Sequence, residues 1–167
     1  MTPNVFDRFR DDGSSTWCAH LPAAVSGLTS LLAFLIGYSV DYQPRPVVAG
    51  VMLVILGLPL WMGYRDNSYL AALGVAAFPA IAMVIGPWMA SAPSSGYMNY
   101  VSLILGATAI TNPIATVTYA VGISTGDGEL LRTRLKTFAV RLIGVLLYTI
   151  FVALGFYFAI LDISTMQ

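Results

Sequence analysis

Five long apolar runs constrain the fold of this chain more than any other feature. A helix needs about 20 predominantly apolar residues to cross a bilayer core about 30 Å thick. Backbone groups find no partners in lipid, and the strict alternation of barrel strands is missing here, so we expect each run to be a transmembrane helix. The runs are Leu21–Val40, Val47–Tyr64, Tyr69–Ser91, Tyr97–Ile123 and Phe138–Leu161.

The composition agrees with this interpretation. Charged residues make up 10% of the chain and hydrophobic residues 57%, with a mean hydropathy of +0.78, whereas a soluble domain is about 25% charged. Too little charge is present to cover a surface that faces water. The sequence therefore predicts an all-α fold, a polytopic integral membrane bundle of five transmembrane helices with short loops. An N-terminal segment, residues 1–20, precedes the membrane domain, residues 21–167, and it does not resemble a cleavable signal peptide.

The basic residues indicate the orientation. Lys and Arg are enriched in short cytoplasmic loops. With the N-terminus inside, the outer connections hold Arg45 as their only basic residue out of eight in the chain. We therefore expect a multi-pass cell-membrane protein with a cytoplasmic N-terminus and an external C-terminus. The basic residues on the inner side are Arg8, Arg10, Arg65, Arg132, Arg134, Lys136 and Arg141.

The longest connection, Ser124–Thr137, carries a basic amphipathic pattern. Leu131, Leu135 and Phe138 are spaced to share one helical face, and the basic residues point elsewhere. We expect a short helix lying on the inner membrane surface before the last span. Contact with anionic lipid headgroups is the favoured role, and recognition of an acidic cytoplasmic partner is the alternative. The residues concerned are Arg132, Arg134, Lys136 and Arg141.

The first run carries a stripe of small residues. Ser26, Ser30, Ala33 and Gly37 recur at a spacing that places them on one side of a helix. Small side chains let helix backbones approach closely in lipid. We expect this stripe to be a packing surface, and contact within the subunit is favoured over contact with a partner.

The fourth run is the most polar. Thr108, Asn112 and Thr116 recur every four residues, and Pro113 leaves the carbonyl of Ala109 without its helical donor. These groups could coordinate a cation or bind a polar solute, as broken helices do in transporters. The favoured interpretation is that they satisfy one another or a neighbouring helix, because no charge accompanies them. The residues of the candidate solute path are Thr108, Thr111, Asn112, Pro113 and Thr116.

The third run contains Pro79 and Pro87. Prolines are tolerated in membrane helices where neighbouring helices satisfy the backbone groups that they leave without a partner. A bend in this run that faces the bend at Pro113 would line a cavity between the two helices.

Groups that perform chemistry are scarce. No Asp, Glu, Lys, Arg or His lies deep in a run, which argues against a proton pump, a voltage sensor or an intramembrane enzyme. Nucleotide loops and hydrolase motifs are missing. Cys18 and His20 form a pair, but a metal site usually takes three or four ligands. We expect no catalytic residues, no metal and no cofactor, and the net charge of zero gives no reason to expect a nucleic acid.

Two functions remain open. The favoured one is a structural or accessory subunit of a membrane assembly, whose partners are the lipid bilayer and other membrane subunits or copies of itself. The alternative is an oligomeric channel or carrier for a neutral solute or a cation, which uses the polar fourth run.

Overall fold

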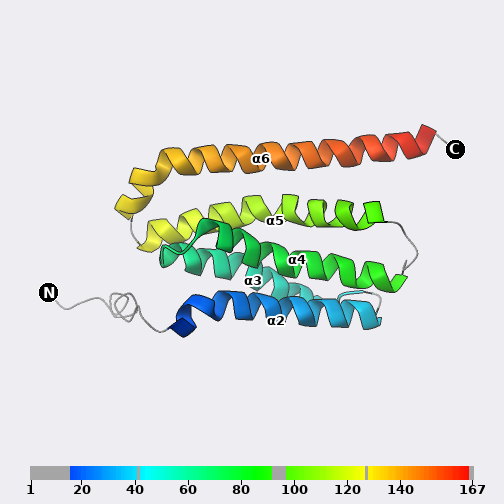
Figure 1. Cartoon of the computed structure of the whole chain (residues 1–167), viewed down its shortest axis with the longest axis horizontal. Helices are drawn as coiled ribbons and strands as arrows, with labels where there is room; N and C mark the ends of the chain where they lie inside the picture. The colour runs from blue at the N-terminus through cyan, green and yellow to red at the C-terminus, as the bar shows by residue number, and fades with distance from the viewer. Residues whose placement is uncertain (1–15, 41, 92–96, 127, 166–167) are drawn as a thin grey trace.

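The computed structural model describes residues 16–40, 42–91, 97–126 and 128–165. All regular secondary structure in these residues is α-helical (Figure 1). The five helices described are α2 (Thr16–Val40), α3 (Arg45–Tyr64), α4 (Tyr69–Ser91), α5 (Tyr97–Gly126) and α6 (Gly128–Thr165).

Each of these five helices is long and apolar enough to cross a membrane. The apolar part of each has a mean hydropathy between 1.4 for α5 and 2.2 for α6. The third run is reproduced without change as α4, Tyr69–Ser91. The second begins two positions earlier than predicted, at Arg45, because Pro44 and Pro46 suit the start of a helix, where a backbone N–H has no helical partner. The predicted all-helical fold class is confirmed for the described residues.

The structure corrects the boundary between the fourth and fifth runs. The predicted connection Ser124–Thr137 is wrong, because α5 continues to Gly126 and α6 already begins at Gly128. The predicted separate amphipathic helix is therefore the beginning of α6. Leu, Arg, Lys and Glu are all good helix formers, and no proline interrupts residues 128–165, so nothing in this segment ends a helix before the apolar run begins.

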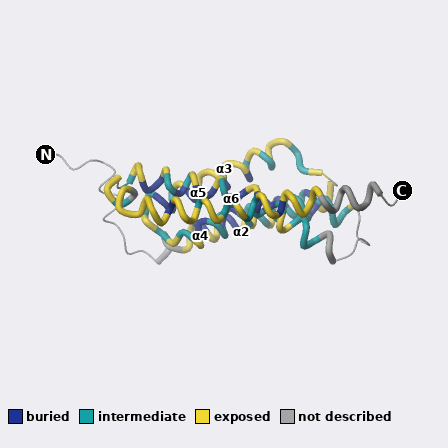
Figure 2. Tube along the Cα trace, turned by 90° about the horizontal axis from the view of Figure 1, so that it is seen from above, coloured by how far each residue is buried: buried dark blue, intermediate teal, exposed yellow. Residues whose placement is uncertain are grey.

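The helices run up and down in turn, but neighbours along the chain are not always the closest neighbours in space. Among the described helices, α2 packs most extensively on α4, and α3 on α5. Of the other helices that the structure describes, the backbone of α6 approaches only α5, and Figure 1 shows α6 at one side of the bundle. Figure 2 shows much of α6 as exposed. The short connections thus fixed the helix directions, whereas side-chain packing decided which helices pair.

Two clusters of buried residues hold the bundle together. The first consists of small and aliphatic side chains from α2 to α5: Ala33, Val51, Ile55, Ala76, Ala80, Ala107 and Ala115. The second includes an aromatic group and joins α3, α4, α5 and α6: Met62, Ala72, Val75, Tyr119, Ile123 and Phe138.

Glycine permits the close contact between α3 and α5. A Cβ atom at Gly122 would collide with the carbonyl oxygen of Leu60, and one at Gly63 would collide with the carbonyl oxygen of Tyr119. Because both obstacles are backbone atoms, a larger residue could fit only if the two helices moved apart. The two helices therefore meet backbone to backbone at this end of the bundle.

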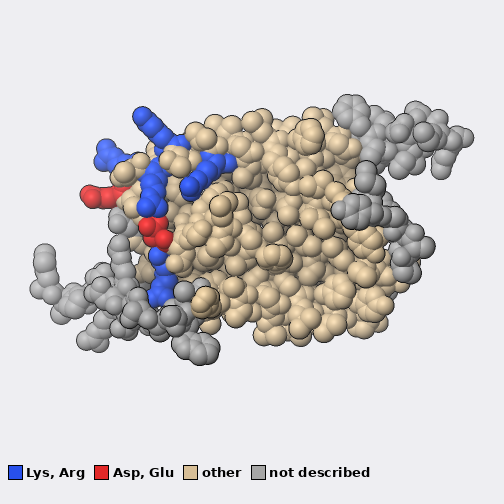
Figure 3. All heavy atoms as spheres, viewed as in Figure 1, with Lys and Arg blue, Asp and Glu red and all other residues tan. Residues whose placement is uncertain are grey.

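Charged side chains gather at one end of the molecule (Figure 3). This end contains the turn between α3 and α4 and the beginning of α6, while Arg45 begins α3 at the opposite end. The described basic residues at the charged end are Arg65, Arg132, Arg134, Lys136 and Arg141. The charge segregation inferred from the sequence is thus present in space, although Arg8 and Arg10 lie outside the described residues.

Candidate functional site along α5 and α6

The threonine hydroxyls of α5 are bonded within their own helix. The Thr108 hydroxyl donates to the carbonyl of Ile104 at 3.0 Å, and that of Thr111 donates to the carbonyl of Ala107 at 2.9 Å. The Thr116 hydroxyl donates to the carbonyl of Asn112 at 2.8 Å. Such bonds to a carbonyl one turn earlier satisfy a hydroxyl without a partner from outside the helix.

Two of these threonines also contact tyrosines from neighbouring helices. The Thr108 hydroxyl lies 2.8 Å from the Tyr148 hydroxyl of α6, and the Thr116 hydroxyl lies 2.8 Å from the Tyr69 hydroxyl of α4. Thr116 is buried, with 2% of its surface exposed. The polar side of α5 therefore binds to two adjacent helices along its length.

The carbonyl that Pro113 leaves without a helical donor has found one in another helix. Pro113 cannot donate to the carbonyl of Ala109. The Thr149 hydroxyl of α6 donates to this carbonyl at 2.9 Å and also approaches the carbonyl of Val145 at 2.9 Å. Tyr148 and Thr149 are adjacent hydroxyls in an otherwise apolar stretch, a signal that sequence reasoning overlooked.

The same arrangement occurs between α2 and α4. Pro79 deprives the carbonyl of Val75 of its helical donor, and the Ser26 hydroxyl of α2 donates to that carbonyl at 2.9 Å. Ser26 is 2% exposed. A proline in one helix is thus matched by a hydroxyl in a neighbour at two places in the bundle.

The small-residue stripe of α2 lies at the contact with α4. Ser26, Ala33 and Gly37 are buried, and Ser30 is half-buried. A Cβ atom at Gly37 would lie 2.7 Å from the Pro87 ring of α4, and one at Gly86 would lie 2.7 Å from the carbonyl oxygen of Phe34. The stripe packs inside the subunit.

The side chain of Asn112 is little engaged by the described part of the bundle. It is partly exposed, and its backbone carbonyl accepts the Thr116 hydroxyl. Its side-chain amide forms no hydrogen bond within the part of the chain that the structure describes. The carbonyl that Pro79 leaves without a helical donor, that of Val75, is turned to α2 and not to α5.

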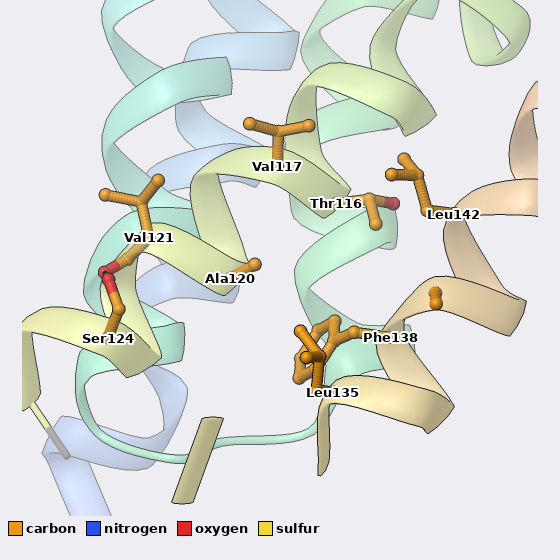
Figure 4. Close-up of a pocket in the computed structure, with 9 residues that line it drawn as sticks. Thr116, Val117, Ala120, Val121, Ser124, Leu135, Phe138 and Leu142 are labelled. Carbon is orange, nitrogen blue, oxygen red and sulfur yellow. Dashed lines mark hydrogen bonds between the residues drawn. The ribbon is translucent and has the colours of Figure 1, made fainter. Parts of the chain in front are cut away.

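A crevice of about 360 Å³ separates α5 and α6 at the charged end of the bundle (Figure 4). Its walls are almost entirely apolar, and its two hydroxyls are engaged: Thr116 as described above, and Ser124 with the carbonyl of Val121 at 2.7 Å. The lining residues are Thr116, Val117, Ala120, Val121, Ser124, Leu135, Phe138, Ala139 and Leu142.

Two of the four basic residues near this crevice are held by the protein itself. The Arg134 guanidinium pairs with the Asp66 carboxylate at 2.8 Å, and both side chains are nearly half exposed. The Arg141 guanidinium lies over the Tyr69 ring, 4.6 Å from its centroid. Arg132 and Lys136 are exposed, and neither forms an ion pair with another described residue.

The turn between α3 and α4 holds Asp66, the residue that pairs with Arg134. Asp66 has a φ of 52°, in the left-handed region that Asp tolerates better than most residues. The Tyr119 hydroxyl of α5 donates to the carbonyl of Asn67 in the same turn. The charged end is therefore fastened by side chains from α5 and α6.

The Cys18–His20 pair gains no described neighbours that would complete a metal site. His20 is exposed, and the Cys18 side chain lies outside the described part of the structure. Within the described residues, no group of three His, Cys, Asp or Glu could hold a metal ion.

No protein-family model, no curated protein and no solved structure matches this chain.

Proposed function

We propose that this chain is a five-span integral membrane protein that acts as a structural or accessory subunit of a membrane assembly. The five apolar helices support membrane insertion, because exposing so large an apolar surface to water would be energetically unfavourable. Phe151 is 77% exposed and Val140 70% exposed, both on α6. In a bilayer these side chains lie against lipid tails or against another subunit.

The proposed orientation has the N-terminus in the cytoplasm and the C-terminus outside. Its support is the gathering of Arg65, Arg134 and their neighbours at the end where α3 turns into α4 and α6 begins. This end would face the cytoplasm by the positive-inside rule. Arg45, at the opposite end, would face outside.

The observation that carries the accessory role is the pairing of polar groups inside the bundle. The Thr108, Thr116 and Thr149 hydroxyls bond to tyrosines or to a free carbonyl of a neighbouring helix. Hydroxyls that bond between helices stabilise the bundle, and they are then not available to line a water-filled transport path. The peripheral α6, which packs its backbone on α5 alone among the described helices, leaves an apolar side for a partner subunit or a second copy.

Purification in a mild detergent, followed by mass spectrometry of everything that elutes with the chain, tests this role. We expect a membrane subunit or a second copy in fixed proportion. A photocrosslinker at Phe151 on α6 should join that partner more strongly than one at Leu53 on α3, which is 72% exposed. A chain that elutes alone and crosslinks equally weakly at both positions would refute the accessory role.

The alternative is an oligomeric channel or carrier, and Asn112 favours it. Its amide is partly exposed, has no partner among the described residues, and lies on the same side of α5 as Thr108 and Thr116. Vesicles that contain only this protein should then take up a neutral solute or a cation, and Asn112→Ala should abolish uptake while the protein stays folded. If the accessory role holds, the vesicles show no flux and Asn112→Ala changes nothing.

A further inference from the structure

The crevice between α5 and α6 has the chemistry of a hydrocarbon site. Its volume of about 360 Å³ falls within the range of about 300–1,000 Å³ that ligand pockets occupy. Neither Thr116 nor Ser124 has a hydroxyl left to donate, because each already bonds to a carbonyl of its own helix. An occupant would therefore meet mostly apolar side chains and no free hydroxyl donor, and an alkyl chain suits such walls better than a polar solute does.

The edge of the crevice is positively charged. Leu135 and Ala139 line it from α6, and Arg132 and Lys136 precede them by three residues each, on adjoining positions of the same helix. Arg134 and Arg141 are engaged with Asp66 and Tyr69. Arg132 and Lys136, which have no described partner, are the two cations left for a ligand.

We propose that this crevice binds one anionic phospholipid, with an acyl chain between α5 and α6 and its phosphate against Arg132 and Lys136. The proposal rests on the membrane insertion proposed above and extends it from general headgroup contact to one defined lipid site. The apolar crevice would hold the acyl chain of the lipid. The charge of Arg132 and Lys136 would favour an anionic headgroup over a zwitterionic one. The occupied crevice would fill the space that the loose packing of α6 leaves against α5.

Lipid retention in native mass spectrometry tests the site. The protein is reconstituted in vesicles of phosphatidylcholine with and without phosphatidylglycerol, extracted in mild detergent and weighed with its bound lipids. We expect wild-type protein to retain one phosphatidylglycerol in preference to phosphatidylcholine. The double variant Arg132→Gln and Lys136→Gln should bind this lipid with an affinity lower by roughly 30-fold, since each cation near an anionic surface contributes a factor of about five.

Two variants that fill the crevice separate the contribution of the lipid's acyl chain from that of its headgroup charge. Ala139→Phe on α6 and Val121→Phe on α5 place a ring in the crevice from opposite walls and leave every charge in place. Both should abolish retention. Arg45→Gln, which removes a cation at the far end of the bundle, is the matched control and should retain the lipid as wild type does.

The outcomes distinguish this site from the proposed function. Resistance of the protein to alkaline carbonate extraction is measured on the same vesicles. A carbonate-resistant protein that retains phosphatidylglycerol no better than phosphatidylcholine would refute the lipid site and leave the membrane role standing. The same conclusion would follow if the variants with a filled crevice retained as much phosphatidylglycerol as the wild type. A protein released by carbonate would refute both. Competition by glycerol phosphate without acyl chains would also contradict the site, because the crevice would then contribute nothing.

Discussion

The hydroxyl of Thr149 lies 2.9 Å from the carbonyl oxygen of Ala109, the acceptor that Pro113 deprives of its own helical donor. The bond joins α5 to α6 at the place where the backbone of α5 would otherwise be unsatisfied. In lipid an unsatisfied backbone group is costly, since no water replaces the missing donor. The proline in α5 and the attachment of α5 to α6 are therefore parts of one interaction.

Removing the Thr149 hydroxyl should loosen α6. Thr149→Val keeps the shape of the side chain and leaves the Ala109 carbonyl without a donor from α6. We expect the free energy of unfolding in mixed micelles to fall by about 0.6 kcal/mol, the average for hydrogen bonds between membrane helices, and by at most about 1.7 kcal/mol. Thr133→Val is the control, because the Thr133 hydroxyl donates only to the Glu129 carbonyl of its own helix.

A second substitution identifies the acceptor. Pro113→Ala restores a backbone N–H that can donate to Ala109, so Thr149→Val should cost less in that background than in the wild type. The difference, measured as a double-mutant cycle, is the coupling between the proline and the hydroxyl. Equal losses in both backgrounds would show that Thr149 stabilises the bundle by other means.

Ser26 should behave in the same way on the other side of the bundle. Its buried hydroxyl supplies the donor that Pro79 withholds from the carbonyl of Val75. Ser26→Ala should lower the unfolding free energy by a similar amount, about 0.6 kcal/mol and at most about 1.7 kcal/mol. The same loss in Ser39→Ala, whose exposed hydroxyl bonds only within α2, would contradict this account.

The close approach of α3 and α5 should not accept a methyl group. Gly122→Ala would drive a Cβ atom into the Leu60 carbonyl, and overpacking of this kind costs about 1 to 3 kcal/mol. Gly144→Ala, where a Cβ atom meets nothing within 4 Å, is the matched control and should leave stability unchanged or slightly raised. Thermal unfolding of the two variants in detergent is the measurement.

The ion pair between Arg134 and Asp66 should contribute little to stability. The side chains are 46% and 43% exposed, and pairs of this kind are worth about 0.2 to 1 kcal/mol. A double-mutant cycle of Arg134→Gln and Asp66→Asn should therefore give a coupling below about 1 kcal/mol. Asn adopts the left-handed backbone conformation of position 66 at little energetic cost, so the cycle reports mainly on charge. A larger coupling would mean that this end of the bundle excludes water.

Local patterns in the sequence predicted the helices well where hydropathy and turn residues agree. The bounds of α4 follow directly, since Asp66 and Asn67 form the turn before it. The beginning of α6 was missed because the charged residues around Arg134 end the apolar run but do not end a helix. Hydropathy reports where the apolar run begins, whereas helical hydrogen bonding extends into the charged residues before it.

The partners of the polar residues could not be predicted in the same way. The sequence indicates that Pro113 leaves a carbonyl free, but the donor, Thr149, is 40 residues away on another helix. Similarly, Ser26 was predicted to pack closely, and its bond to Val75 depends on α2 lying beside α4. Helix order around a bundle is decided by the packing of whole faces, which short loops alone do not encode.

The accessibility of two introduced cysteines in intact cells, in a Cys18→Ser background, tests directly whether the bundle spans the membrane and in which orientation. Tyr42→Cys lies between α2 and α3, and Ser68→Cys lies in the turn between α3 and α4. A membrane-impermeant maleimide should label the protein through Tyr42→Cys at once and through Ser68→Cys only after permeabilisation. Equal labelling of both before permeabilisation would contradict a membrane-spanning bundle, and the reverse order would contradict the proposed orientation.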